Sequence, residues 1–213
     1  TLILLGLCVG SASWTWSMVL ATPQAAMPWI IGGAIGGFVL AMITSFYPKA
    51  ASITGPLYAL AEGLFLGGLT ATINARYPGI AMQAVGLTFG TMFALLMAYQ
   101  TGLIKATENF KLGVFAATGG IAMLYLVSMV LGFFSIQVPF IHDSNWFGIA
   151  FSGFVVVIAA LNLVLDFDFI EAAAARGTPK YMEWYAAFGL MVTLVWLYVE
   201  ILRLLMKLRS NER

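Results

Sequence analysis

Seven long apolar runs are the feature of this sequence that most constrains its fold. They cover roughly residues 2–21, 28–47, 55–75, 80–104, 112–136, 145–169 and 185–206. A helix needs about 20 mostly apolar residues to cross the hydrocarbon core of a bilayer. Barrel strands would instead alternate over about 10 residues, and backbone within lipid must otherwise be helical. We therefore predict an all-α, polytopic membrane protein, a single transmembrane domain over residues 1–213 with seven helices in a bundle.

The composition agrees with a protein that is solvated by the lipid bilayer. Hydrophobic residues make up 62% of the chain and charged residues 9%, whereas soluble domains carry about 25% charged residues. A net charge of +1 gives no clustered basic face, so we expect no nucleic acid partner. Because the chain begins at Thr1 within an apolar run, we expect further residues before it.

The scarcity of cysteine and histidine limits the metal sites and the catalysis that are possible. Cys8 is the only cysteine and His142 the only histidine, so a site of several Cys or His ligands is excluded. An all-oxygen site for a hard cation remains possible. The sequence has no P-loop, no lysine deep in the last run and no paired histidines. We therefore expect no enzyme and no organic cofactor.

Glycine spacing predicts where helices approach each other closely. Small residues four apart recur at Gly32/Gly36, Gly33/Gly37, Gly63/Gly67 and Gly86/Gly90. Such spacing lets two backbones come together where no hydrophobic force drives association. Glycine is also simply common in membrane helices. We favour close packing of the second, third and fourth helices.

The basic residues of the loops and those of the C-terminal tail indicate opposite orientations in the membrane. Five of them fall on one side of the bundle: Lys49, Lys105, Lys111, Arg176 and Lys180. The loops on the other side carry only Arg76, so the positive-inside rule makes the first side cytoplasmic. The C-terminal tail disagrees, because it places four more basic residues on the opposite side: Arg203, Lys207, Arg209 and Arg213. We follow the loops, whose bias is spread over three connections.

Acidic residues within the apolar runs are the strongest functional signal. They are Glu62, Asp166, Asp168, Glu171 and Glu200. A carboxylate at bilayer depth is costly and persists where it is paired, protonated or exposed to a water-filled cavity. Helical periodicity puts Asp166 on the face of Asn162 and Asp168 on the face of Glu171.

Structural roles would also account for several of these acids. Helix–helix hydrogen bonds would explain Glu62 and Glu200, and solvation at a helix end would explain Asp168 and Glu171. His142 and Asp143 are expected to be an exposed pair in a loop. A functional role is favoured for Asp166. Two close carboxyls cannot both ionise cheaply, so they share a proton or admit a cation such as Ca²⁺ in its place.

Three segments resemble the Bax inhibitor (transmembrane Bax inhibitor motif) family in its bacterial form. Gly55 through Thr70 resembles the family's third helix, with Gly67 at the shared glycine. Leu165-Asp166-Phe167 is similar to the Tyr-Asp pattern of its sixth helix, and Leu197-Tyr198-Val199-Glu200-Ile201 to the Leu-Tyr-Leu-Asp pattern of its seventh. The departures are Leu165 in place of tyrosine and Glu200 in place of aspartate. The resemblance implies a multi-pass protein of the bacterial inner (plasma) membrane.

The resemblance also implies a proton-sensitive Ca²⁺ leak, gated by one acid on each of the last two helices. Asp166 and Glu200 would be this pair and the ligands of Ca²⁺, with Glu62 or Asp168 as an accessory cation site. A simple hairpin does not bring Asp166 and Glu200 level, so either the sixth helix runs on through Ala175 or Glu183 is the partner. The alternative function is a non-conducting stress-response regulator that binds a membrane protease or another membrane protein.

Overall fold

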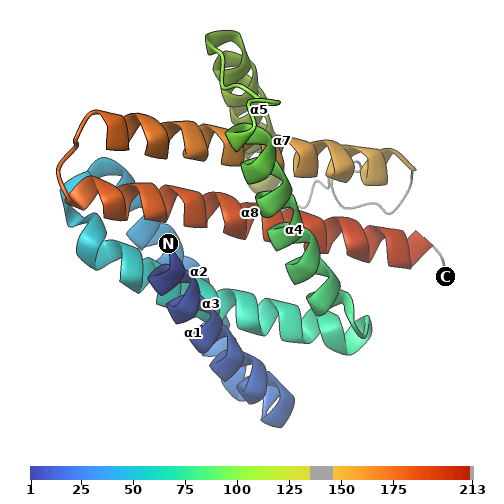
Figure 1. Cartoon of the computed structure of the whole chain (residues 1–213). Helices are drawn as coiled ribbons and strands as arrows, with labels where there is room; N and C mark the ends of the chain where they lie inside the picture. The colour runs from blue at the N-terminus through green and yellow to red at the C-terminus, as the bar shows by residue number, and fades with distance from the viewer. Residues whose placement is uncertain (135–145, 212–213) are drawn as a thin grey trace. The chain divides into compact units, whose positions relative to one another are not determined.

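Seven long helices form the described part of the chain. The structure is a computed structural model that describes residues 1–134 and 146–211. The helices are α1 (Leu2–Ala21), α2 (Pro23–Phe46), α3 (Ala51–Arg76), α4 (Ile80–Gln100), α5 (Glu108–Phe133), α7 (Trp146–Ala175) and α8 (Tyr181–Asn211), with a short 3₁₀ turn η1 (Pro48–Ala50) before α3 (Figure 1). All seven are long and apolar enough to cross a membrane. The prediction of an all-α polytopic membrane protein is confirmed.

Several helix boundaries differ from the prediction, and local chemistry explains the differences. α2 begins at Pro23 rather than at Pro28, because proline is tolerated in the first turn and, within a membrane helix, also in the interior. α7 continues to Ala175 because a run of alanines favours helix. It ends before Gly177, whose φ of +59° is the left-handed conformation that terminates helices. The predicted sixth helix therefore runs on through Ala175, as one of the two alternatives for the Asp166–Glu200 pair requires.

The chain divides into two compact units, each of which takes part of α7 and α8. Unit 1 contains residues 1–81 and 169–195, and unit 2 contains residues 82–168 and 196–213. The single domain over 1–213 stays a prediction.

In unit 1, glycines bring α3 against both α1 and α2. A Cβ on Gly33 or Gly37 of α2 would collide with α3, and a Cβ on Gly63 or Gly67 of α3 would collide with α1. The close approach of α2 and α3 is thus confirmed, and α1 is the further partner. Gly86 and Gly90 of α4 lie in unit 2, where a Cβ on either would meet no described atom within 4 Å, and the approach of α4 to α2 and α3 stays a prediction.

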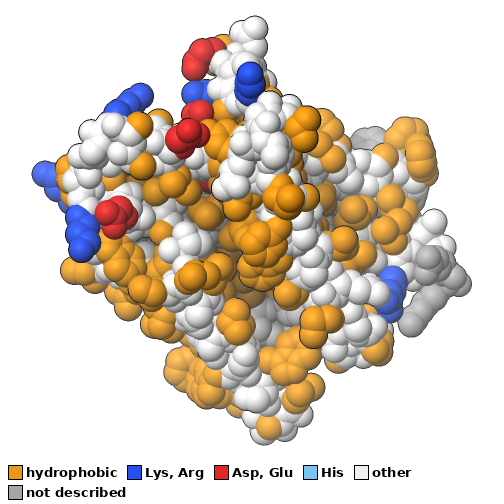
Figure 2. All heavy atoms as spheres, viewed as in Figure 1, with side chains coloured by type: hydrophobic (Ala, Val, Ile, Leu, Met, Phe, Trp, Pro, Cys, Tyr) orange, Lys and Arg blue, Asp and Glu red, His pale blue; other side chains and the backbone are white. Residues whose placement is uncertain are grey.

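Unit 2 has its own apolar core, in which α5, α7 and α8 meet. Ile121 of α5 packs with Val155 and Ile158 of α7, and Tyr125 and Trp196 border this cluster. The outer surface is also apolar, as lipid contact requires: Figure 2 shows hydrophobic side chains over much of the visible face. Large exposed examples are Phe38, Met82 and Phe115.

Candidate functional site

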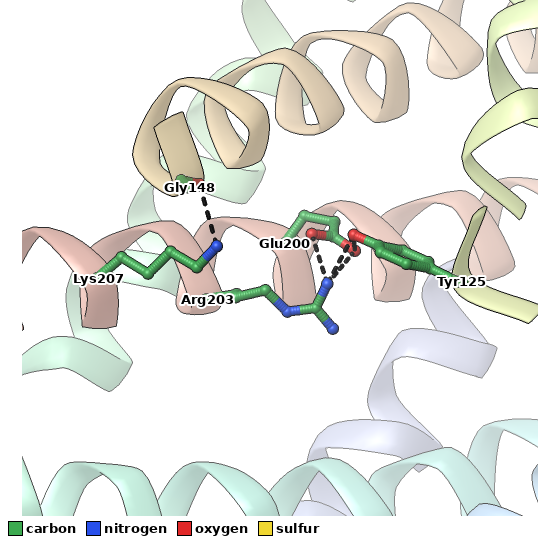
Figure 3. Close-up of polar contacts among 5 residues, drawn as sticks. All are labelled: Tyr125, Gly148, Glu200, Arg203 and Lys207. Carbon is green, nitrogen blue, oxygen red and sulfur yellow. Dashed lines mark hydrogen bonds and ion pairs between the residues drawn. The ribbon is translucent and has the colours of Figure 1, made fainter. Parts of the chain in front are cut away.

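A buried ion pair on α8 is the centre of the candidate site in unit 2. Glu200 is only 1% exposed, and Nη1 of Arg203, one turn later, lies 3.2 Å from both of its carboxylate oxygens. The Tyr125 hydroxyl, from α5, donates to Oε1 of Glu200 at 3.0 Å (Figure 3). The carboxylate therefore has a charged and a neutral donor in a span that is otherwise apolar.

Arg203 also contacts Tyr125 directly, which closes the cluster. Its Nη1 donates to the Tyr125 hydroxyl at 2.6 Å, and its guanidinium carbon lies 5.1 Å from the centre of the Tyr125 ring. The side chain of Arg203 remains 33% exposed, against 2% for that of Glu200. Arg203 is thus the more exposed of the two charged residues, and a long basic side chain of this kind can extend its charged end to the membrane interface.

Further polar contacts continue from this cluster along α5, α7 and α8. Lys111 of α5 pairs with Asp168 of α7 at 2.9 Å, and Asn162 of α7 donates to Thr118 of α5 at 2.8 Å. At the other end, the buried Lys207 of α8 donates to the Gly148 carbonyl at 3.0 Å. We call this set the polar line: Lys111–Asp168, Thr118–Asn162, Tyr125–Glu200–Arg203 and Lys207–Gly148.

The polar line is about as long as a bilayer core is thick. Lys111, Thr118 and Tyr125 are seven residues apart, so they lie on one face of α5 and span about 21 Å at 1.5 Å per residue. Gly148 and Asp168, the α7 residues at the two ends of the line, are twenty residues apart, or about 30 Å along that helix. This length is close to the ~30 Å of the hydrocarbon core. Polar groups are therefore available at successive depths through unit 2.

A scan against protein-family models decides the family. The model described as Bax inhibitor 1 like matches residues 1–210. The chain belongs to the Bax inhibitor 1-like family. Searches of curated proteins and of solved structures give no significant match.

The acid pair that the resemblance to this family implied is not brought together. Antiparallel pairing of α7 and α8 places Lys207 beside Gly148 and Trp196 beside the Val155–Ile158 cluster. Glu200, between Trp196 and Lys207, is therefore level with about Val155. Asp166 lies eleven residues farther along α7, or about 17 Å along the helix axis. Two carboxyls at such different depths cannot share a proton directly.

The remaining predicted residues lie at separate places. Asp168 joins the polar line through Lys111, and Asp166 is one turn from Asn162 on the same face of α7. Glu62 lies on α3 in unit 1, and Glu183 is exposed in the first turn of α8. His142 and Asp143 lie outside the described residues. Among those described, no three His, Cys, Asp or Glu side chains group as a metal site would require.

The basic tail contains the partner that sequence reasoning missed. From the sequence, Arg203 is placed in the tail, although its position three residues after Glu200 predicts an ion pair on one helix face. Lys207 bonds Gly148, and Arg209 donates to Gln83 of α4 at 3.2 Å. Arg203, Lys207 and Arg209 therefore have contacts within unit 2. For this reason we count them less than the loop residues as evidence for the orientation in the membrane. The orientation itself stays a prediction.

Proposed function

We propose that this protein lets cations, Ca²⁺ foremost, cross the membrane along the polar line under the control of protons. The observation that carries the proposal is the Tyr125–Glu200–Arg203 cluster, with a carboxylate that is 1% exposed in the interior of a membrane-spanning helix. Ionisable residues are rare in such helices and mark ion and proton pathways. Carboxylate, amide and hydroxyl oxygens along the line are ligands that suit a hard cation.

The geometry of the cluster favours a lock over a cation-binding site. By the lock we mean the Glu200–Arg203 ion pair, which holds the pathway closed. Both oxygens of Glu200 already accept hydrogen bonds from Arg203, so an entering cation would have to displace the guanidinium. Protonation of Glu200 removes its negative charge and with it the ion pair. Arg203 is then free to extend toward water, and the line opens. Acidification is therefore expected to increase flux through this lock.

The acids on α7 have a second role in this proposal. Asp166 and Asp168 lie on the side of the polar line away from Lys207, and Lys111 balances the charge of Asp168. We propose that Asp166, on the face of Asn162, attracts cations toward the lock. The two predicted acids then act in series, at different depths, and not as one pair. We further propose the bacterial inner membrane as the site of action.

Replacing both acids should abolish the response to pH. We expect the double substitution Asp166→Asn with Glu200→Gln to give Ca²⁺ entry that no longer increases on acidification, because neither group can gain a proton. The measurement is Ca²⁺ entry into dye-loaded liposomes that contain the purified protein. The exposed Glu183→Gln is the matched control and should behave as the unmodified protein does.

Two results of this experiment would overturn the proposal. Flux and pH dependence that are unchanged in the double variant would remove both acids from the pathway. No flux at any pH, with correctly inserted protein, would favour the non-conducting regulator. Co-purification of a stoichiometric membrane partner would then be the supporting measurement for that function.

A further inference from the structure

Glu62 is a second, partly buried acid within an apolar helix, and it is not part of the polar line. It lies in unit 1, on α3, eleven residues after Ala51 and fourteen before Arg76. These separations correspond to about 17 and 21 Å along the helix, so its carboxyl lies near the middle of a membrane span. The proposed lock in unit 2 gives it no role.

Three helices supply the surroundings of the Glu62 carboxyl. The Tyr58 hydroxyl, one turn earlier on α3, hydrogen-bonds it, and Tyr58 is itself only 2% exposed. On α2 the carboxyl lies against the backbone, because a Cβ on Gly37 would be 2.9 Å from Oε1 of Glu62. Cys8 of α1 is the remaining titratable neighbour and is buried. The carboxyl thus occupies the space that the absent side chain of Gly37 leaves.

Within unit 1, no Lys or Arg side chain is available to Glu62 at this depth. The sequences of α1 and α2 contain no Lys or Arg, and Arg76 at the end of α3 is the only one within that helix. The other basic residues of unit 1, Lys49, Arg176 and Lys180, lie outside the long helices. An ionised carboxylate here would have the Tyr58 hydroxyl as a neutral donor and no paired cation from unit 1, so it would carry most of the cost of a charge in the membrane.

We propose that Glu62 is a proton-binding site of unit 1, protonated at neutral pH, whose neutral carboxyl lets α2 pack on α3 at Gly37. A protonated carboxyl both donates and accepts hydrogen bonds, so it suits a site with the Tyr58 hydroxyl and no cation. Ionisation would place a charge against the α2 backbone. The packing of unit 1 is therefore present at low pH and weakens as the carboxyl ionises.

A lipid-soluble carbodiimide tests this directly, because it reacts with protonated carboxyls. The acid gives its proton to a reagent nitrogen while a carboxyl oxygen adds to the central carbon, and rearrangement leaves a stable N-acylurea with the whole mass of the reagent. We expect mass spectrometry of liposome-embedded protein treated with dicyclohexylcarbodiimide to find the adduct on Glu62, with less labelling as pH rises. Glu200, whose carboxylate pairs with Arg203, should remain unlabelled at neutral pH.

Matched variants make either result decisive. Glu62→Gln should remove the adduct and keep the thermal stability of the protein, since the amide is as neutral as the protonated acid, and should make that stability less sensitive to alkaline pH. Glu200→Gln should leave the Glu62 adduct unchanged. An unlabelled Glu62 together with a destabilised Glu62→Gln would overturn the proposal, and protection by added Na⁺ or Ca²⁺ would make the residue a cation ligand instead. None of these experiments measures flux, so their outcome does not depend on the proposed lock in unit 2.

Discussion

Replacing Glu200 by Gln is expected to raise Ca²⁺ entry at pH 7 by about tenfold to a hundredfold, which is a loss of roughly 1.4 to 2.8 kcal/mol from the closed state. The amide keeps the shape of the side chain but not its charge, so Arg203 is no longer held. Breaking a fully buried ion pair costs about 3–5 kcal/mol, and the effect here is smaller because Arg203 is 33% exposed. The variant should also lose the increase of flux on acidification, which liposome flux across a pH series measures.

Arg203→Gln provides the test of whether the two residues act as one lock. It should raise flux at pH 7 in the same way, and the double variant should add little to either single variant, because residues that act as a unit are not additive. Arg209→Gln is the control, since Arg209 is on the same helix but bonds Gln83. A Glu200→Gln variant with the flux and pH response of the unmodified protein would refute the lock, as would independent, additive effects of the two substitutions.

The fold followed from the sequence because the bilayer leaves few choices. An apolar run of about 20 residues has to be a helix, and the predicted run at 2–21 has the bounds of α1, Leu2–Ala21. The errors lie at helix ends, where a polar or proline residue does not force a break. Pro28 lies within α2, and α8 extends from Tyr181 to Asn211, beyond the apolar run predicted at 185–206. Helix length at the membrane surface is set by local propensity and caps, which hydropathy does not report.

The acidic residues of the site could be predicted from the sequence, but their partners and their depths in the membrane could not. A charge in a membrane helix is conspicuous in one sequence, so Glu200, Asp166 and Glu62 could be singled out. Their partners depend on packing between segments far apart in the chain, as with Tyr125 and Glu200 or Lys111 and Asp168. The depth of each acid depends on helix register in the same way. That is why the family-implied pair of Asp166 and Glu200 becomes two acids whose depths differ by about 17 Å, measured along the axis of α7.

Gly67→Ala is expected to be the most destabilising small substitution in unit 1. A Cβ at this position would lie 2.7 Å from Cα and 2.8 Å from the carbonyl carbon of Ala12, and closer still to its oxygen. All three are backbone atoms that no rotamer change can move, so α1 would have to shift away from α3. Overpacking of this kind costs about 1–3 kcal/mol or more. Thermal unfolding in detergent should therefore show a clearly lower midpoint.

Gly32→Ala is the matched control, because a Cβ there would meet no described atom within 4 Å. Alanine favours helix over glycine by about 1 kcal/mol, so this variant should be as stable as the unmodified protein or slightly more so. The same propensity gain applies at Gly67, and the difference between the two variants isolates the steric cost of separating α1 from α3. Equal midpoints for the two variants would mean that the backbones of α1 and α3 do not approach at Gly67. Glycine at this position would then be tolerated and not required.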